Sequence, residues 1–459
     1  MKKFLIVYSL LLIVIPSFSQ ISQNVNLLYQ WHDTTITINF RDARYSDVWG
    51  FVQNAREYAV IGSTFGTHVF DVTNPSNTYQ ADSVAGAFQG FNVNHRDYKD
   101  YIGYLYAVCD EGSSTLQIFD LSYLPDSISK VYDDDSLFIR AHTIFIDSVS
   151  ARLYTCGTNS NALSIYSILN PSSPQLLSHY NDVPYVHDIY VRNDTAYLNC
   201  GDSGLYIIDF QTPSVPVTFG SLTVYPDQGY NHSGWLNSTG DIYVFCDETY
   251  GRELKVCDVS DFGNIQILST LTSGVSDSSV AHNAFIKDNF IYIAYYNDGL
   301  QIFDISNPFA PIKKGYYDTF APSQKDDFRG AWGVYPFLPS GIVLLSDRNT
   351  GLYVFDVSQA LVSVPELNID NDNISIHPNP FTSMVNINFS IETDQNVSIL
   401  LHDIQGREVN TLLSSHHNAG QYNYQFDFSD KKFESEIYIL QIIMDNQVVT
   451  KRIVKLNFR

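Results

Sequence analysis

Five histidines recur at intervals of 45 to 50 residues and are the side chains best suited to shared chemistry: His95, His142, His187, His232 and His282. A neutral imidazole binds divalent metals, and its charge changes near neutral pH. If the intervals place these side chains around one axis with Asp97, Asp110 or Asp188, they predict a site for a divalent metal or an anion. The alternative is structural: each histidine hydrogen-bonds the backbone of the neighbouring repeat, because repeat positions recur first for packing. Trp49 and Trp332 are expected near the same place in the flanking repeats.

One loop combines aromatic and polar side chains and is the main candidate for gripping a sugar or a peptide. It runs from residue 225 to 235 and includes Tyr225, Asp227, Tyr230 and Trp235 beside His232. Aromatic faces with a few polar groups are typical of ligand sites.

Other motifs give weaker evidence for a chemical role. Asp110-Glu111 and Asp247-Glu248 are carboxylate pairs that suit acid/base work or calcium, or else are solvated turns. The segment 201–204, Gly-Asp-Ser-Gly, has the form of a protease nucleophile segment but aligns with hairpin turns elsewhere in the chain. The sequence has no P-loop, dinucleotide fingerprint, zinc-protease helix or paired Cys-x-x-Cys. No catalytic residue and no resident cofactor is therefore assigned.

A repeated strand phrase explains the histidine spacing. Copies of a Leu-x-Ile-Phe-Asp-Ile phrase end at 42- to 52-residue intervals on Asp71, Asp120, Ser167, Asp209, Asp258, Asp304 and Asp356. That period fits one four-stranded propeller blade per copy. Aromatic residues form 14% of the chain against 16% charged, which favours half-buried strands. We expect an all-β fold, a seven-bladed β-propeller over residues 20–360, with the histidines at one mouth of its channel.

The chain's own beginning is expected to complete the last blade. The final repeat has no outer strand after Asp356, whereas residues 27–31 resemble the outer strand at 176–180. Closing the circle in this way removes sheet edges that would otherwise invite aggregation.

Cysteines are expected to be free. Cys109, Cys156, Cys200 and Cys246 occupy the same place in four successive repeats, too far apart for bridges between neighbours. We interpret them as small buried hydrophobes.

The repeat resembles the LVIVD type, and residues 25–360 resemble the secreted bacterial proteins of the choice-of-anchor B family. The most specific stretches are 225–235, Cys246-Asp247-Glu248 and Leu254-Lys255-Val256. The resemblance implies a propeller shared among proteins with different attachment modules and implies no known reaction.

The two ends of the chain predict export. Residues 1–19 begin with Lys2 and Lys3 and continue in an apolar run of about 12 residues, which is typical of a signal peptide and short of the roughly 20 needed to span a bilayer. No later segment is apolar enough to cross a membrane. The net charge of −23 repels phosphate backbones, so no nucleic acid partner is expected.

A polar linker at 361–373 leads to a new pattern of short alternating strands at 374–459, which suits a small β-sandwich. This part resembles the C-terminal sorting domain of the type IX secretion (Por) system. The matching residues include Pro378, Asn379, Pro380, Gly406, Arg407, Gly420, Tyr438, Lys451 and Lys455, while Ser435-Glu436 departs from the usual glycine. The resemblance implies the secretion machinery as a partner, and release outside the cell or attachment to its surface.

Two functions remain open from the sequence. The first is a non-catalytic binding or scaffold protein at the cell surface, with a glycan or a protein as ligand. The second is an extracellular hydrolase or lyase with its site at the propeller mouth, which rests on fold analogy alone.

Overall fold

The computed structural model describes residues 22–158, 161–320, 327–361, 374–391, 393–403, 408–430, 433, 437–444 and 447–456. The chain divides into two compact units, residues 1–362 and 363–459. The expected signal peptide and most of the expected linker lie outside the described residues. Among the described residues, no helix has the length and apolar character needed to cross a membrane.

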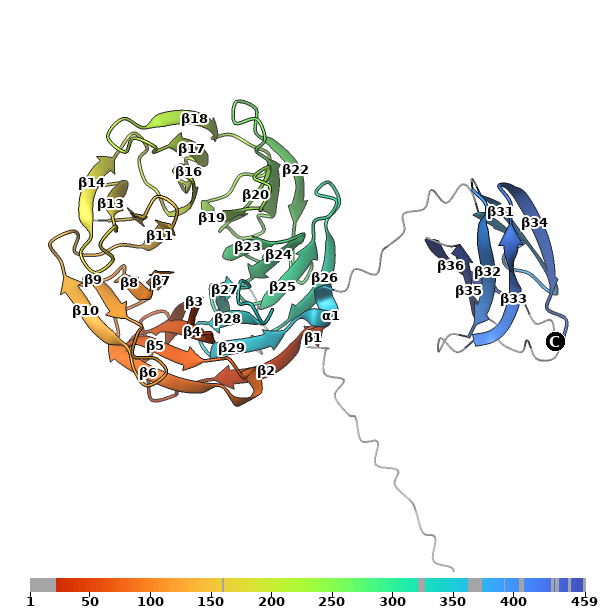
Figure 1. Ribbon diagram of the computed structural model, residues 1–459, viewed down its shortest axis with the longest axis horizontal. Helices are drawn as coiled ribbons and strands as arrows, with labels where there is room; N and C mark the ends of the chain where they lie inside the picture. The colour runs from red at the N-terminus through yellow and green to blue at the C-terminus, as the bar shows by residue number, and fades with distance from the viewer. Residues whose placement is uncertain are drawn as a thin grey trace, which may run out of the picture. The chain divides into compact units, whose positions relative to one another are not determined.

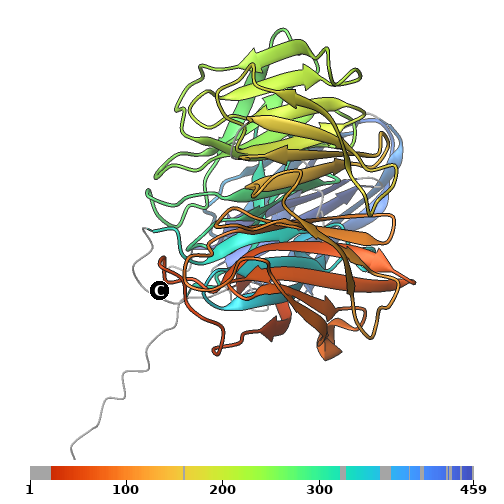
Figure 2. The same ribbon diagram turned by 90° about the vertical axis from the view of Figure 1, so that its left-hand side faces the viewer.

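The described part of unit 1 contains seven antiparallel sheets arranged around a centre, which confirms the all-β, propeller-like architecture (Figure 1). The strands run across the thickness of the ring when it is viewed from the side (Figure 2). The innermost strands are β3 (Tyr45–Gln53), β7 (Arg96–Tyr101), β11 (Thr143–Asp147), β15 (Asp188–Arg192), β19 (Asn231–Leu236), β23 (Asn283–Lys287) and β27 (Ala331–Tyr335). The second strands are β4 (Arg56–Ser63), β8 (Tyr104–Cys109), β12 (Arg152–Cys156), β16 (Thr195–Asn199), β20 (Ile242–Asp247), β24 (Phe290–Ala294) and β28 (Val343–Asp347).

The repeated phrase forms the third strand of every sheet. These strands are β5 (Gly66–Asp71), β9 (Leu116–Asp120), β13 (Leu163–Ser167), β17 (Leu205–Asp209), β21 (Leu254–Asp258), β25 (Leu300–Asp304) and β29 (Gly351–Asp356). The closing aspartate accepts a hydrogen bond from the backbone N–H two residues later, as Asp304 does from Ser306 at 2.8 Å. In the copy with serine, the Ser167 hydroxyl takes the same bond from Leu169 at 3.5 Å. The aspartate therefore recurs because it stabilises the turn that leaves the strand.

The outer strands are β6 (Tyr79–Ala85), β10 (Ser129–Asp134), β14 (Gln175–Tyr180), β18 (Val217–Leu222), β22 (Gln266–Leu271), β26 (Ile312–Tyr317) and, from the start of the chain, β2 (Asn26–Trp31). β2 pairs with β29, so the expected closure by the N-terminal strand is confirmed. Its register shift between Leu27 and Tyr29 matches the irregularity that each other outer strand shows against its third strand. A further strand that the sequence did not predict, β1 (Ser22–Gln23), pairs with β26.

Helical structure in unit 1 is limited, within the described residues, to one 3-10 turn at Pro75–Asn77 and the short α1 at Ser358–Leu361. The segment 201–204 forms the expected turn, in which the Gly204 N–H bonds the Gly201 carbonyl. All five cysteines are buried with free thiols, in agreement with the prediction.

The described part of unit 2 contains two antiparallel sheets. One is formed by β30 (Ile374–His377), β31 (Met384–Ile391) and β34 (Gly420–Asp427), and the other by β33 (Glu408–His417), β32 (Gln395–His402), β35 (Ile437–Met444) and β36 (Gln447–Val454). Alternate residues of β31 and β32 are buried, as in a sheet with one face on a core. One hydrophobic cluster, which includes Ile387, Ile399 and Leu440, joins both sheets.

Candidate functional site

The five histidines meet at the start of the innermost strands. Their ring centroids are 4.5 Å apart for His95 and His142, 4.2 Å for His142 and His187, 4.2 Å for His187 and His232, and 4.4 Å for His232 and His282. Trp332 completes the array, at 4.1 Å from His282 and 5.4 Å from His95. We call these six side chains the histidine circle. The sheet of β3–β6 adds no ring to it: Trp49, expected nearby, is in mid-strand and hydrogen-bonds Asp100 instead.

Hydrogen bonds between sheets fix the orientation of several of these imidazoles. The His187 Nδ1–H donates to the His232 carbonyl at 3.2 Å, and the His282 Nδ1–H donates to the Trp332 carbonyl at 2.6 Å. Because a carbonyl only accepts, the proton must be on Nδ1, and Nε2 keeps its lone pair. Hydrogen bonding to the neighbouring repeat therefore explains why these two histidines recur. It leaves the Nε2 of each available to a ligand.

Burial keeps most of the circle uncharged. It lowers the pKa of His95, His187 and His282 well below the ordinary value, and neighbouring histidines add to the effect. His142 differs: burial opposes its protonation, but its hydrogen bond to Asp110 and that carboxylate's charge leave its pKa raised. The Nδ1 to Oδ2 distance of that pair is 2.9 Å.

The carboxylates of the two Cys-Asp-Glu segments are engaged rather than solvated. Glu111 Oε2 accepts the backbone N–H groups of Asn94 and His95 at 3.0 and 3.1 Å. Asp247 is fully buried and forms an ion pair with Lys255 at 3.0 Å. Glu248 accepts a hydrogen bond from the Tyr296 hydroxyl, and its other oxygen is 3.6 Å from His232 Nε2.

Beyond the histidines, the channel contains a layer of carboxylates around one lysine. Lys99 donates to Asp97 at 2.9 Å, and Asp47 and Asp188 line the same narrow cavity of about 40 Å³. Burial raises the pKa of Asp188 to about 7, and burial with repulsion from Asp97 raises that of Asp47 well above its usual range. A cavity of this size holds a few water molecules or an ion, and excludes a sugar ring.

The opposite end of the channel is aromatic. A second cavity of about 210 Å³, the aromatic cup, is lined by Trp49, Lys99, Asp100, Phe145, Ile146, Trp235 and Phe337. The Trp235 ring stacks on Phe337 with centroids 5.3 Å apart, and Trp49 Nε1 donates to Asp100 at 2.8 Å. The Lys99 ammonium is 4.4 Å from the Trp49 ring centroid. The cup thus combines partly exposed apolar faces with two charged groups at its wall.

The loop at 225–235 does not form one pocket. Tyr225 is buried and donates its hydroxyl to Asp247 at 2.7 Å. Asp227 is exposed and forms an ion pair with Arg252. Tyr230 contacts His187 of the histidine circle, with centroids 5.3 Å apart, whereas Trp235 lies in the aromatic cup. The structure therefore places Tyr230 at the histidine end and Trp235 at the aromatic end, whereas Tyr225 and Asp227 are not in the lining of either cavity.

In unit 2, several residues of the sorting motif pack on the last strand. The Asn379 Oδ1, between Pro378 and Pro380, accepts the Val454 N–H at 2.8 Å. Lys455 donates to the Phe433 carbonyl at 2.8 Å, and Tyr438 is buried in the core. Gly420 opens β34 and Lys451 lies in β36. Gly406 and Arg407 lie outside the described residues.

Sequence reasoning missed part of this arrangement. The contact of Tyr296 with Glu248 joins residues 48 positions apart, and no local motif marks it. Phe145, Phe337 and Lys99 were not proposed as site residues. A signal was present for one of them, since Phe145 lies three residues after His142, as Trp235 does after His232.

Comparisons with known proteins agree with this two-part organisation. Residues 375–456 match the family model of the secretion system C-terminal sorting domain. Residues 185–224 and 280–319 match the LVIVD repeat. The sorting domain indicates export by type IX secretion to the cell surface or the extracellular space. None of the curated proteins searched matches the chain.

The solved structures similar to this chain include WD40 repeats, which form β-propellers. The WD40 repeats of RRP9 align with a TM-score of 0.52 at 8% identity, covering 72% of this chain and 96% of that one. U3-55K aligns with a TM-score of 0.51 at 8% identity, covering 71% and 99%. A protein from Lactobacillus plantarum aligns with a TM-score of 0.50 at 10% identity, covering 81% and 95%. At such low identity the likeness shows the fold alone.

Proposed function

We propose that this protein is an exported seven-bladed β-propeller with a C-terminal β-sandwich sorting domain, and that it is a non-catalytic binding protein for an extracellular glycan. The aromatic cup carries the proposal. Partly exposed Trp and Phe faces stack on the apolar face of a sugar, while Asp100 and Lys99 offer hydrogen bonds to its hydroxyls. The resemblance to choice-of-anchor B proteins, which are secreted, supports the same setting.

The two cavities fit a binding protein better than a hydrolase or a lyase that cleaves a polymer. The cavity that the histidines and carboxylates line measures only about 40 Å³, which is too small for a sugar ring. The cup, at about 210 Å³, has room for one terminal sugar ring and lacks a histidine in its lining.

The ligand is tested with residues 20–459 on a glycan array, followed by titration of each bound glycan. Trp235→Leu should weaken binding about tenfold, the size expected for loss of one aromatic stacking contact. Trp31→Leu is the matched control, because Trp31 is also partly exposed but lies in the outer strand β2, where it packs on Tyr45, and this variant should bind as the wild type does. Unchanged binding by Trp235→Leu, or capture of a protein but no glycan, would contradict the proposal.

Export is tested separately by deleting residues 374–459. The truncated propeller should accumulate in the periplasm, because the recognised sorting unit is gone, whereas the full chain should reach the outside or remain on the cell surface. Cell fractionation distinguishes these results, and secretion of the truncated chain would refute the role of unit 2.

A further inference from the structure

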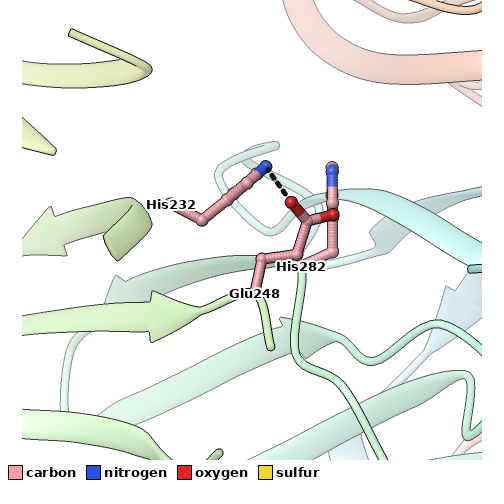
Figure 3. Close-up of side chains that lie close together, drawn as sticks. All are labelled: His232, Glu248 and His282. Atoms are coloured by element: carbon pink, nitrogen blue, oxygen red, sulfur yellow. Dashed lines mark ion pairs between the residues drawn. The ribbon is translucent and has the colours of Figure 1, made fainter. Parts of the chain in front are cut away.

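Three side chains at the histidine end of the channel have the composition of a metal site. The ligand atoms of His232, Glu248 and His282 all lie within 4.8 Å of one another. Figure 3 shows the Glu248 carboxylate beside both imidazoles, with an ion pair drawn to His232. Two imidazoles and a carboxylate are a recurrent ligand set for Zn²⁺, with a fourth position left for water.

The spacing of the first pair suits a shared ion better than a direct bond. His232 Nε2 and Glu248 Oε2 are 3.6 Å apart, which is longer than a charge-assisted hydrogen bond. Two ligands of a tetrahedral ion with bonds of about 2.1 Å are about 3.4 Å apart. Binding therefore needs little movement of this pair, and a modest approach by His282.

The surroundings orient the ligands as metal sites require. The His282 Nδ1–H donates to the Trp332 carbonyl at 2.6 Å, so Nε2 is the nitrogen with a free lone pair. The Tyr296 hydroxyl holds the second oxygen of Glu248. Such outer contacts to a backbone carbonyl and to a ligating carboxylate are typical of protein zinc sites.

The three ligands lie in a largely buried setting. The His232 and Glu248 side chains are 6% and 20% exposed, and His282 is 2% exposed. A cation bound among them would compensate the desolvation of the Glu248 carboxylate and of the imidazole lone pairs. We infer that His232, Glu248 and His282 bind one Zn²⁺ at the histidine end of the channel. This inference is independent of the glycan proposal, since the aromatic cup lies at the other end.

The test is calorimetric titration of Zn²⁺ into untagged residues 20–459 after treatment with a chelator. The wild type should bind one Zn²⁺ per chain, and Glu248→Gln should weaken binding at least about tenfold by removing the anionic ligand. Zn²⁺ should also raise the melting temperature of the wild type and not that of Glu248→Gln, because an ion that binds only the folded state stabilises it.

Glu111→Gln is the matched control. Glu111 follows Cys109-Asp110 as Glu248 follows Cys246-Asp247, but its carboxylate is occupied by backbone N–H groups. This variant should bind Zn²⁺ as the wild type does. The inference is overturned if the wild type binds no stoichiometric Zn²⁺, if Glu248→Gln binds it equally well, or if Glu111→Gln loses it to the same extent.

Discussion

At the scale of single residues, burial decides the protonation of most histidines in the propeller. His68, outside the histidine circle, shows this in a simple setting. It is 4% exposed, its Nε2 is 2.8 Å from the Ser63 hydroxyl, and burial lowers its pKa to about 4. The unfolded chain therefore binds a proton at this position at higher pH than the folded chain does.

Replacing His68 should change how stability depends on pH. Because its folded pKa is below the ordinary 6.5, its neutral form favours folding above pH 6.5, and stability is lost as the pH falls from 6.5 toward about 4. Between pH 7 and 5 the wild type should lose about 2 kcal/mol more unfolding free energy than His68→Gln, at 1.36 kcal/mol per pH unit below 6.5. Urea denaturation across this range measures the difference, and parallel curves for the two proteins would contradict it.

At the scale of elements, the outer strand β2 comes from the start of the described chain and completes the sheet of the last repeat. Its ladder with β29 runs from Asn26 opposite Asp356 to Trp31 opposite Leu352. Beside it, Val25 is buried in the cluster that also contains Phe355 and Ala360. Loss of this strand would expose both the edge of β29 and part of that cluster.

Deletion of residues 22–31 should therefore destabilise unit 1. A loss of a few kcal/mol lowers the melting temperature of a domain this large by at least about 5 °C. Circular dichroism during heating measures it, with Asn26→Ser, at an exposed position of the same strand, as a control that should melt within about 1 °C of the wild type. An unchanged melting temperature after the deletion would show that closure contributes nothing to stability.

At the scale of the whole molecule, the two units have separate cores. The hydrophobic cluster of the sorting unit draws all its residues from positions 374–453, and the propeller clusters draw theirs from residues before 362. Units with their own cores unfold independently unless a large apolar interface couples them.

Removing residues 363–459 should leave the propeller's melting temperature unchanged. Scanning calorimetry of the full chain should show two transitions, and the truncated chain should keep the one that belongs to unit 1. A single cooperative transition in the full chain, or a lower melting temperature after truncation, would mean that the sorting unit supports the propeller.

The repeat and its consequences could be predicted from the amino-acid pattern alone. Copies of one phrase must adopt one local structure, so the third strands, their capping aspartates and the meeting of the five histidines were predictable. The N-terminal strand was predictable for the same reason, because the last repeat lacks an outer strand and residues 27–31 resemble one. The free cysteines were predictable from their equivalent positions.

Which side chains share a site depends instead on how the sheets pack in three dimensions. Tyr230 and Trp235 are close in sequence, but a strand advances about 3.3 Å per residue, so β19 carries them to opposite ends of the channel. Conversely, Glu248 and Tyr296 meet although 48 residues separate them, because adjacent sheets bring their loops together. Repetition fixes equivalent positions, whereas contacts between different positions of neighbouring sheets depend on how the sheets pack around the axis.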